Sequence, residues 1–123
     1  MNDSILTSVK KAVGGIIEGD TAFDPELVMH INSSLSKLTQ LGVGPVSGFQ
    51  IEDSTATWTD FMGDDPRLNL VKTYVALDVR MIFDPPTVGA VAEAYKSQIA
   101  ELTWRINVQA ESKLESQLGE NSK

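Results

Sequence analysis

Two adjacent prolines, Pro85 and Pro86, interrupt the longest helical pattern of this chain. Neither has a backbone N–H to donate, and each ring clashes with a preceding helical turn, so a helix that arrives through Phe83 must end there. Thr87 follows directly, and its hydroxyl can cap a second helix by accepting a hydrogen bond from a backbone N–H one turn further on. The sequence therefore predicts two helices that meet at a sharp corner.

Both helices carry enough apolar residues to pack against each other. Beyond the corner, apolar residues alternate four and three apart, which is the spacing of a single helical face that needs a partner. The arriving helix is apolar on nearly every side, as in a core helix that several neighbours cover. The second helix contributes Val88, Ala92, Tyr95, Ile99, Leu102 and Ile106, and the arriving helix contributes Leu68, Val71, Tyr74, Val75, Leu77, Val79, Met81, Ile82 and Phe83. We expect a helical hairpin whose first arm lies in the core.

Two more helices are predicted nearer the N-terminus. The second of them has a strong start signal, because Asp24 can cap it and Pro25 can take the first helical position without losing a hydrogen bond. Gly42 supplies a left-handed stop. The first helix has the apolar face Ile5, Leu6, Val9, Ala12 and Val13, and the second has Val28, Ile31, Leu35, Leu38 and Leu41.

A loop rich in turn formers occupies Gly42, Val43, Gly44, Pro45, Val46, Ser47 and Gly48. Its two valines, Val43 and Val46, indicate that it lies on protein rather than in water. Residues 49–51 alternate in polarity but are too few to found a sheet, so we expect extended chain.

A short helix is expected between this loop and the hairpin. Asp53 or Ser54 can cap it, and Gly63 can end it. Threonines weaken its helical propensity, so its formation depends on burying Trp58 and Phe61.

The predicted fold class is all-α, a small bundle of about four to five helices with a long C-terminal helical hairpin broken at Pro85-Pro86 and little or no strand. Its 123 residues have the length of one domain. After Val108 the apolar pattern fades, although Leu114 and Leu118 recur four apart. We therefore expect a helical domain over 1–108 and a C-terminal tail over 109–123 that frays and is mobile in the free subunit.

Composition narrows the range of functions. The chain has no cysteine, which removes disulfides, thiolate zinc sites and a cysteine nucleophile from consideration. We expect a soluble intracellular protein, because Met1-Asn2-Asp3-Ser4 does not resemble a signal peptide and no apolar run is long enough to span a membrane. A formal net charge of −7 argues against gripping DNA phosphates, although an acidic surface can let DNA pass without sticking.

Motifs that resemble catalytic or ligand sites are incomplete. Residues 14–21 imitate a phosphate-binding loop, but Asp20 stands where lysine is needed. His30 has no clustered partners for metal binding or catalysis, so a solvent-facing or half-buried structural histidine is expected. Ser47 lies in Gly-Pro-Val-Ser-Gly, which is not the nucleophile motif of hydrolases. We therefore predict no catalytic residue and no cofactor.

Four aspartates form an acidic cluster, Asp53, Asp60, Asp64 and Asp65. The alternate-residue spacing and the closing glutamate of a calcium loop are missing, so helix caps explain these residues better than a metal site does.

Two residues of the hairpin need partners. Asp78 lies among apolar residues of the core helix, and a cross-helix bond to Arg105 is our preferred pairing. Trp104 lies about 160° around its helix from Leu102 and Ile106. Either another helix of the same domain covers Trp104, or a neighbouring molecule does.

Several segments of the chain resemble small helical head-tail connector proteins, also called adaptor or head-completion proteins, of tailed double-stranded DNA bacteriophages. The similar segments before the hairpin are Met29-His30-Ile31-Asn32, Leu41-Gly42-Val43-Gly44-Pro45, Gly48-Phe49, Ile51-Glu52-Asp53 and Trp58-Thr59-Asp60-Phe61. Those within it are Val71-Lys72-Thr73-Tyr74, Arg80, Phe83-Asp84-Pro85-Pro86-Thr87 and Ile99-Ala100-Glu101-Leu102-Thr103-Trp104-Arg105-Ile106-Asn107. Together the resemblance covers roughly residues 3–108, and none of these segments is a catalytic signature.

This resemblance implies a non-enzymatic adaptor, made in the host cytoplasm and located in the virion neck. It implies a ring of about twelve subunits below the portal protein, with a stopper or tail-completion protein beneath and DNA passing through without sequence-specific binding. Loops and the C-terminal segment of such proteins make neighbour and portal contacts. Our candidate interface residues are therefore Gly42, Val43, Gly44, Pro45, Val46, Trp104, Val108, Leu114 and Leu118. The alternative is a non-viral regulatory bundle whose Trp104 face docks a partner helix.

Overall fold

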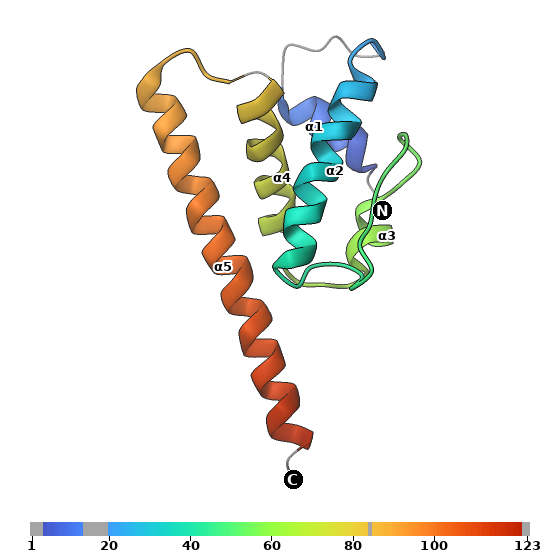
Figure 1. Ribbon diagram of the computed structural model, residues 1–123, viewed down its shortest axis with the longest axis vertical. Coiled ribbons are helices and arrows are strands. Elements are labelled where there is room, and N and C mark those ends of the chain that lie inside the picture. Colours follow the sequence, from blue (N-terminus) through green and yellow to red (C-terminus); the bar gives the residue numbers. More distant parts are fainter. Residues whose placement is uncertain (1–3, 14–19, 84, 122–123) are drawn as a thin grey trace.

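The computed structural model describes residues 4–13, 20–83 and 85–121, with side chains described as far as residue 108 (Figure 1). The described residues form the helices α1 (Ile5–Val13), α2 (Asp24–Gln40), α3 (Trp58–Met62), α4 (Leu68–Phe83) and α5 (Gly89–Asn121). These ranges contain no strand; a single antiparallel bridge joins Ser4 to Thr57. The predicted all-α bundle is confirmed.

Helix α4 is the centre of the bundle, as its all-round apolar pattern predicts. It packs against α1, α2 and α5, and Figure 1 shows it between α2 and α5. Val71, Val75 and Val79 on α4 are completely buried. The other helices are therefore positioned mainly by the faces of α4 that they cover.

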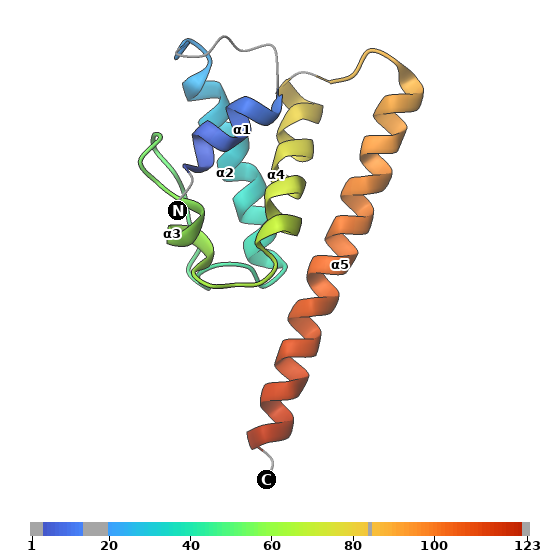
Figure 2. The same cartoon turned by 180° about the vertical axis from the view of Figure 1, so that it is seen from behind.

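The packing of α5 against the bundle is graded along its length. Ile106 is fully buried and Leu102 is 8% exposed, whereas Val88, just before the helix, is 59% exposed. Figures 1 and 2 both show α5 tilting away from α4 toward the start of α5, and its far end extending past the bundle. The predicted stripe is thus anchored mainly by its last two members.

The end of α5 differs from the expectation. Its backbone stays helical to Asn121, so the prediction that the helix frays after Val108 is wrong. Polar composition does not prevent a helix from continuing, because glutamate, lysine and glutamine have good helical propensity. Mobility of residues 109–123 in the free subunit stays a prediction.

The corner between α4 and α5 is longer than expected. Helix α4 ends at Phe83, as the prolines require, but α5 begins only at Gly89. The carbonyl of Val88 accepts from the backbone N–H of Ala92 at 3.1 Å, so Val88 directly precedes the helix. The prediction that Thr87 caps α5 is therefore wrong, because Thr87 lies one residue too early.

Two other predicted caps are also wrong. Phe23, not Asp24, precedes α2, and the Asp24 carboxylate instead lies 2.9 Å from Lys10 Nζ of α1. Pro25 occupies the first turn, as predicted. Thr57, rather than Asp53 or Ser54, caps α3, because Asp60 three residues later reciprocates its hydrogen bond. Trp58 and Phe61 are buried, as that helix requires.

The partner predicted for Asp78 is wrong. Asp78 accepts from Ser34 Oγ of α2, and Lys37 Nζ of α2 lies 3.2 Å from Asp78 Oδ2. Arg105 is exposed on α5. Because α2 and α5 cover different sides of α4, Asp78 reaches the polar groups of α2 instead.

Leu102 tests whether the α4–α5 seam belongs to the core. Leu102→Ala should lower the free energy of unfolding by about 2 to 5 kcal/mol, because it removes buried contacts and leaves a cavity. Urea denaturation measures the change. Val88→Ala is the matched control and should have little effect, since Val88 is mostly exposed. Equal stability of Leu102→Ala and the wild type would contradict this assignment.

Tyr74 of α4 supplies a test by pH. Burial, and after it the negative charge of Asp78, raise the pKa of the Tyr74 hydroxyl to about 12, while a hydrogen bond with Thr103 opposes the shift. A tyrosine in the unfolded chain ionises near about pH 10. The folded state therefore holds this proton more tightly, and its contribution to stability is complete below about pH 10 and is lost between about pH 10 and 12.

Urea denaturation at about pH 9 and about pH 11 should show a smaller loss of stability in Tyr74→Phe than in the wild type. Parallel losses in the two proteins would show that Tyr74 contributes nothing to the pH dependence.

Candidate functional site

The loop over residues 42–48 is anchored at one end and free at its tip. Val43 is fully buried and its backbone N–H donates to the Leu38 carbonyl at 3.0 Å. Val46 is 100% exposed. The prediction that both valines lie on protein is therefore right for Val43 and wrong for Val46.

Gly44 explains how this loop sits so close to the core. Its φ is 77°, in the left-handed region, and a Cβ placed there would lie 2.4 Å from Cε1 of the buried Phe61 ring. A side chain is excluded both by the backbone conformation and by space. Gly42, with φ of 85°, supplies the predicted left-handed stop after α2.

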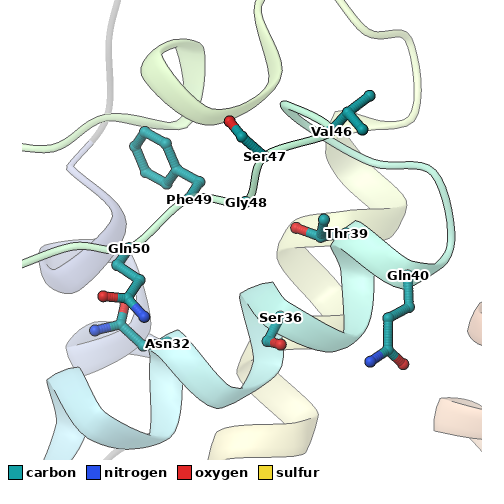
Figure 3. Close-up of a pocket in the computed structure, with 9 residues that line it drawn as sticks. All are labelled: Asn32, Ser36, Thr39, Gln40, Val46, Ser47, Gly48, Phe49 and Gln50. Atoms are coloured by element: carbon teal, nitrogen blue, oxygen red, sulfur yellow. The ribbon is translucent and has the colours of Figure 1, made fainter.

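A neutral hollow of ≈ 560 Å³ lies on one side of the loop, against α2 (Figure 3). Asn32, Ser36, Thr39 and Gln40 of α2 line one wall, and Val46, Ser47, Gly48, Phe49 and Gln50 line the other. Asn32 fixes the extended segment: its Oδ1 accepts from the Ile51 N–H at 2.7 Å and its Nδ2 donates to the Ile51 carbonyl at 3.0 Å. None of these lining residues titrates near neutral pH, so the hollow suits polar contact rather than acid–base chemistry.

A second hollow of ≈ 1050 Å³ lies on the other side of the loop. The loop lines it with Gly42, Gly44, Pro45 and Val46, and α5 lines it with Asn107. The turn between α3 and α4 closes it. The two interface regions chosen from the sequence, the loop and the α5 face, therefore border one hollow.

Arg67 joins these two regions, and the sequence analysis missed it. Only 5% of Arg67 is exposed. Its guanidinium donates to the Asp65 carboxylate, to the Gly42 carbonyl at 3.1 Å and to the Ile106 carbonyl of α5 at 3.3 Å. A cation just before α4 opposes the helix dipole, which was the available sign that Arg67 has other partners.

Trp104 is the largest exposed apolar side chain on α5, at 66% exposure. No other helix within the described ranges covers it, so the alternative of cover by its own domain is wrong. Val108 on the same side is half-buried. Leu114 and Leu118 lie within α5, but their side chains fall outside the description.

The remaining candidate residues have structural surroundings. His30 is half-buried, with Nε2 3.6 Å from Glu26 Oε1. Asp53 accepts from the Thr55 hydroxyl and backbone N–H, which together lower the pKa of this carboxyl, and so it stabilises a turn rather than a helix. Of the proposed phosphate-loop imitation, residues 14–19 lie outside the described residues.

The described side chains contain no group of three histidines, cysteines or acidic residues that could hold a metal ion. The described helices also include none with the length and apolarity needed to cross a bilayer. What the site does offer is an exposed tip, an exposed tryptophan and two hollows, an arrangement suited to docking another macromolecule.

Substitution of Arg67 tests whether it holds the loop and α5 together. Arg67→Ala should lower the free energy of unfolding by about 3 to 5 kcal/mol, because the Asp65 carboxylate loses its guanidinium partner inside the protein. Arg67→Lys should recover only part of this loss, since an ammonium cannot reach three acceptors in the geometry of the planar guanidinium. Urea denaturation gives both values, and full recovery by lysine would refute the role of the guanidinium fork.

A family model described as "Phage connector protein" matches residues 5–113 of the chain. No curated protein and no solved structure matches it. The family match confirms the resemblance that the sequence segments indicate, and it covers well over half of the 123 residues. The chain therefore belongs to the phage connector family, a family of head-tail connector proteins with a structural rather than an enzymatic role.

Proposed function

We propose that this protein is the subunit of a ring that sits below the portal in the virion neck, links the head to the stopper or tail, and continues the DNA channel. The observation that carries this proposal is the family match over residues 5–113. The same match disfavours a non-viral regulatory bundle.

The exposed surface supports a role in assembly. Val46 is fully exposed at the loop tip, and Trp104 is mostly exposed on α5. A tryptophan contributes strongly to binding when a partner covers it, and an isolated protein has no reason to leave one uncovered. We assign the loop and the Trp104 side of α5 to contacts with the portal or with a neighbouring subunit.

The net charge of −7 suits a protein that DNA must pass. Sustained binding to DNA phosphates requires clustered lysine and arginine, which release counterions. A ring of acidic subunits repels the phosphates, and so DNA can move through it without being held.

The same charge controls when the ring forms. A ring needs head-to-tail contacts that close, and like-charged subunits repel one another before those contacts can form. Free subunits should therefore stay monomeric at low salt, while screening or high concentration promotes closure. The portal concentrates the subunits, which makes weak contacts sufficient.

Portal attachment tests this function. Mixed with the cognate portal protein and viewed by negative-stain microscopy, the wild type should form rings on the portal. Trp104→Ala and deletion of residues 110–123 should each abolish attachment or ring formation, because each removes part of the proposed contact surface. Melting curves of the deletion variant should match those of the wild type.

Met29→Ala is the matched control, since Met29 is a 62% exposed apolar residue on α2, outside this surface. It should assemble normally. Attachment of the truncated chain as efficient as that of the full chain would contradict a role for the C-terminal segment, and failure of the wild type to bind the portal would contradict the function itself.

A further inference from the structure

A closed head-to-tail ring requires two different surfaces on each subunit. The loop over residues 42–48 and α5 border one hollow, and Arg67 bonds to both at Gly42 and Ile106. They therefore form one continuous surface rather than two complementary ones. The second surface must lie elsewhere on the subunit.

A hollow of ≈ 280 Å³ between α1 and α4 offers such a surface, and we call it the α1–α4 groove. It is lined by Ser8, Val9, Ala12, Trp58, Lys72, Thr73, Ala76 and Leu77. Most of these residues are apolar or small. The indole N–H of Trp58 already donates to Ser8 Oγ at 3.2 Å, which leaves its ring available for apolar contact.

A subunit cannot fill this groove with its own Trp104. Helix α5 is held against the bundle by Leu102 and Ile106, and the helical geometry turns Trp104 about 160° away from them. Figure 2 shows α1 beside α4 at the front of the bundle, with α5 standing apart as a separate column. Trp104 and the groove therefore belong to different faces of the molecule.

We propose that Trp104 of one subunit inserts into the α1–α4 groove of a second copy, an inference that rests on the proposed ring. A groove of ≈ 280 Å³ with an aromatic floor suits one large flat side chain. Trp104 is the most exposed aromatic residue within the described ranges.

Charge complementarity favours a second copy as the occupant. Glu101 is exposed one turn before Trp104, and Lys11 is exposed beside Ala12 at the edge of the groove. The knob therefore carries a negative neighbour and the groove a positive one, although the whole chain is strongly acidic. Such a pair fixes orientation and offsets part of the repulsion between copies.

Substitutions on the two sides test the contact separately. Ala12→Glu places a charge in the groove at an exposed position, and Trp104→Ala removes the knob. Analytical ultracentrifugation should show that each raises the concentration needed for half-maximal ring formation by at least about tenfold. Ala94→Glu is the matched control, because Ala94 is exposed on α5 outside the groove, and it should assemble like the wild type. If Ala12→Glu fails to fold, Thr73→Glu, at another exposed lining position, replaces it.

Mixing the two variants gives a sharper result. The groove variant keeps Trp104 and the Trp104→Ala subunit keeps its groove, so an equimolar mixture should form heterodimers and no rings. Normal rings from both groove variants would overturn the inference but leave the proposed function intact. Loss of portal attachment in Trp104→Ala alone, with normal rings, would show that Trp104 meets the portal instead. Failure of the wild type to form any ring would refute both proposals.

Discussion

The burial of α4 is the constraint on which the rest of the structure depends. Helices α1, α2 and α5 each cover part of it, and no other helix contacts as many partners. A helix surrounded in this way has no free face for a polar group, so Asp78 is tolerated only because Ser34 and Lys37 of α2 meet it. The same interaction that satisfies Asp78 fixes α2 along α4, and with it the start of the exposed loop after α2.

Helix α5 combines a fixed point with two less restrained ends. Burial of Leu102 and Ile106 holds it near its middle, where Arg67 also bonds to the Ile106 carbonyl. Toward its start the stripe becomes exposed, and toward its end the helix passes beyond the bundle. A partner that moves either end would act on the helix through this one point, and Arg67 would carry the movement to the loop at Gly42. The position of the candidate surface therefore follows from a contact deep in the fold.

The sequence predicts the elements of this fold well, because helical periodicity and the Pro85-Pro86 break report on local structure. It predicts caps less well, since several polar residues compete at each helix start; only the reciprocal bond between Thr57 and Asp60 decides the start of α3. Long-range partners are the least predictable. Arg67 gathers acceptors from three separate segments, and Val43 and Val46 differ only through the loop geometry that the positive φ angles of its glycines impose.

Exposure of Trp104 and Val46 has a cost that the free subunit must manage. Apolar side chains left in water favour nonspecific association, and the net charge of −7 opposes it by keeping copies apart. That protection works only while each contact is weak, since strong contacts would form rings or fibres away from the portal. A closed ring resolves the conflict, because every subunit gains two contacts while none is left with an open end. Weak, oriented contacts combined with repulsion thus favour assembly where the portal gathers the subunits, and disfavour it elsewhere.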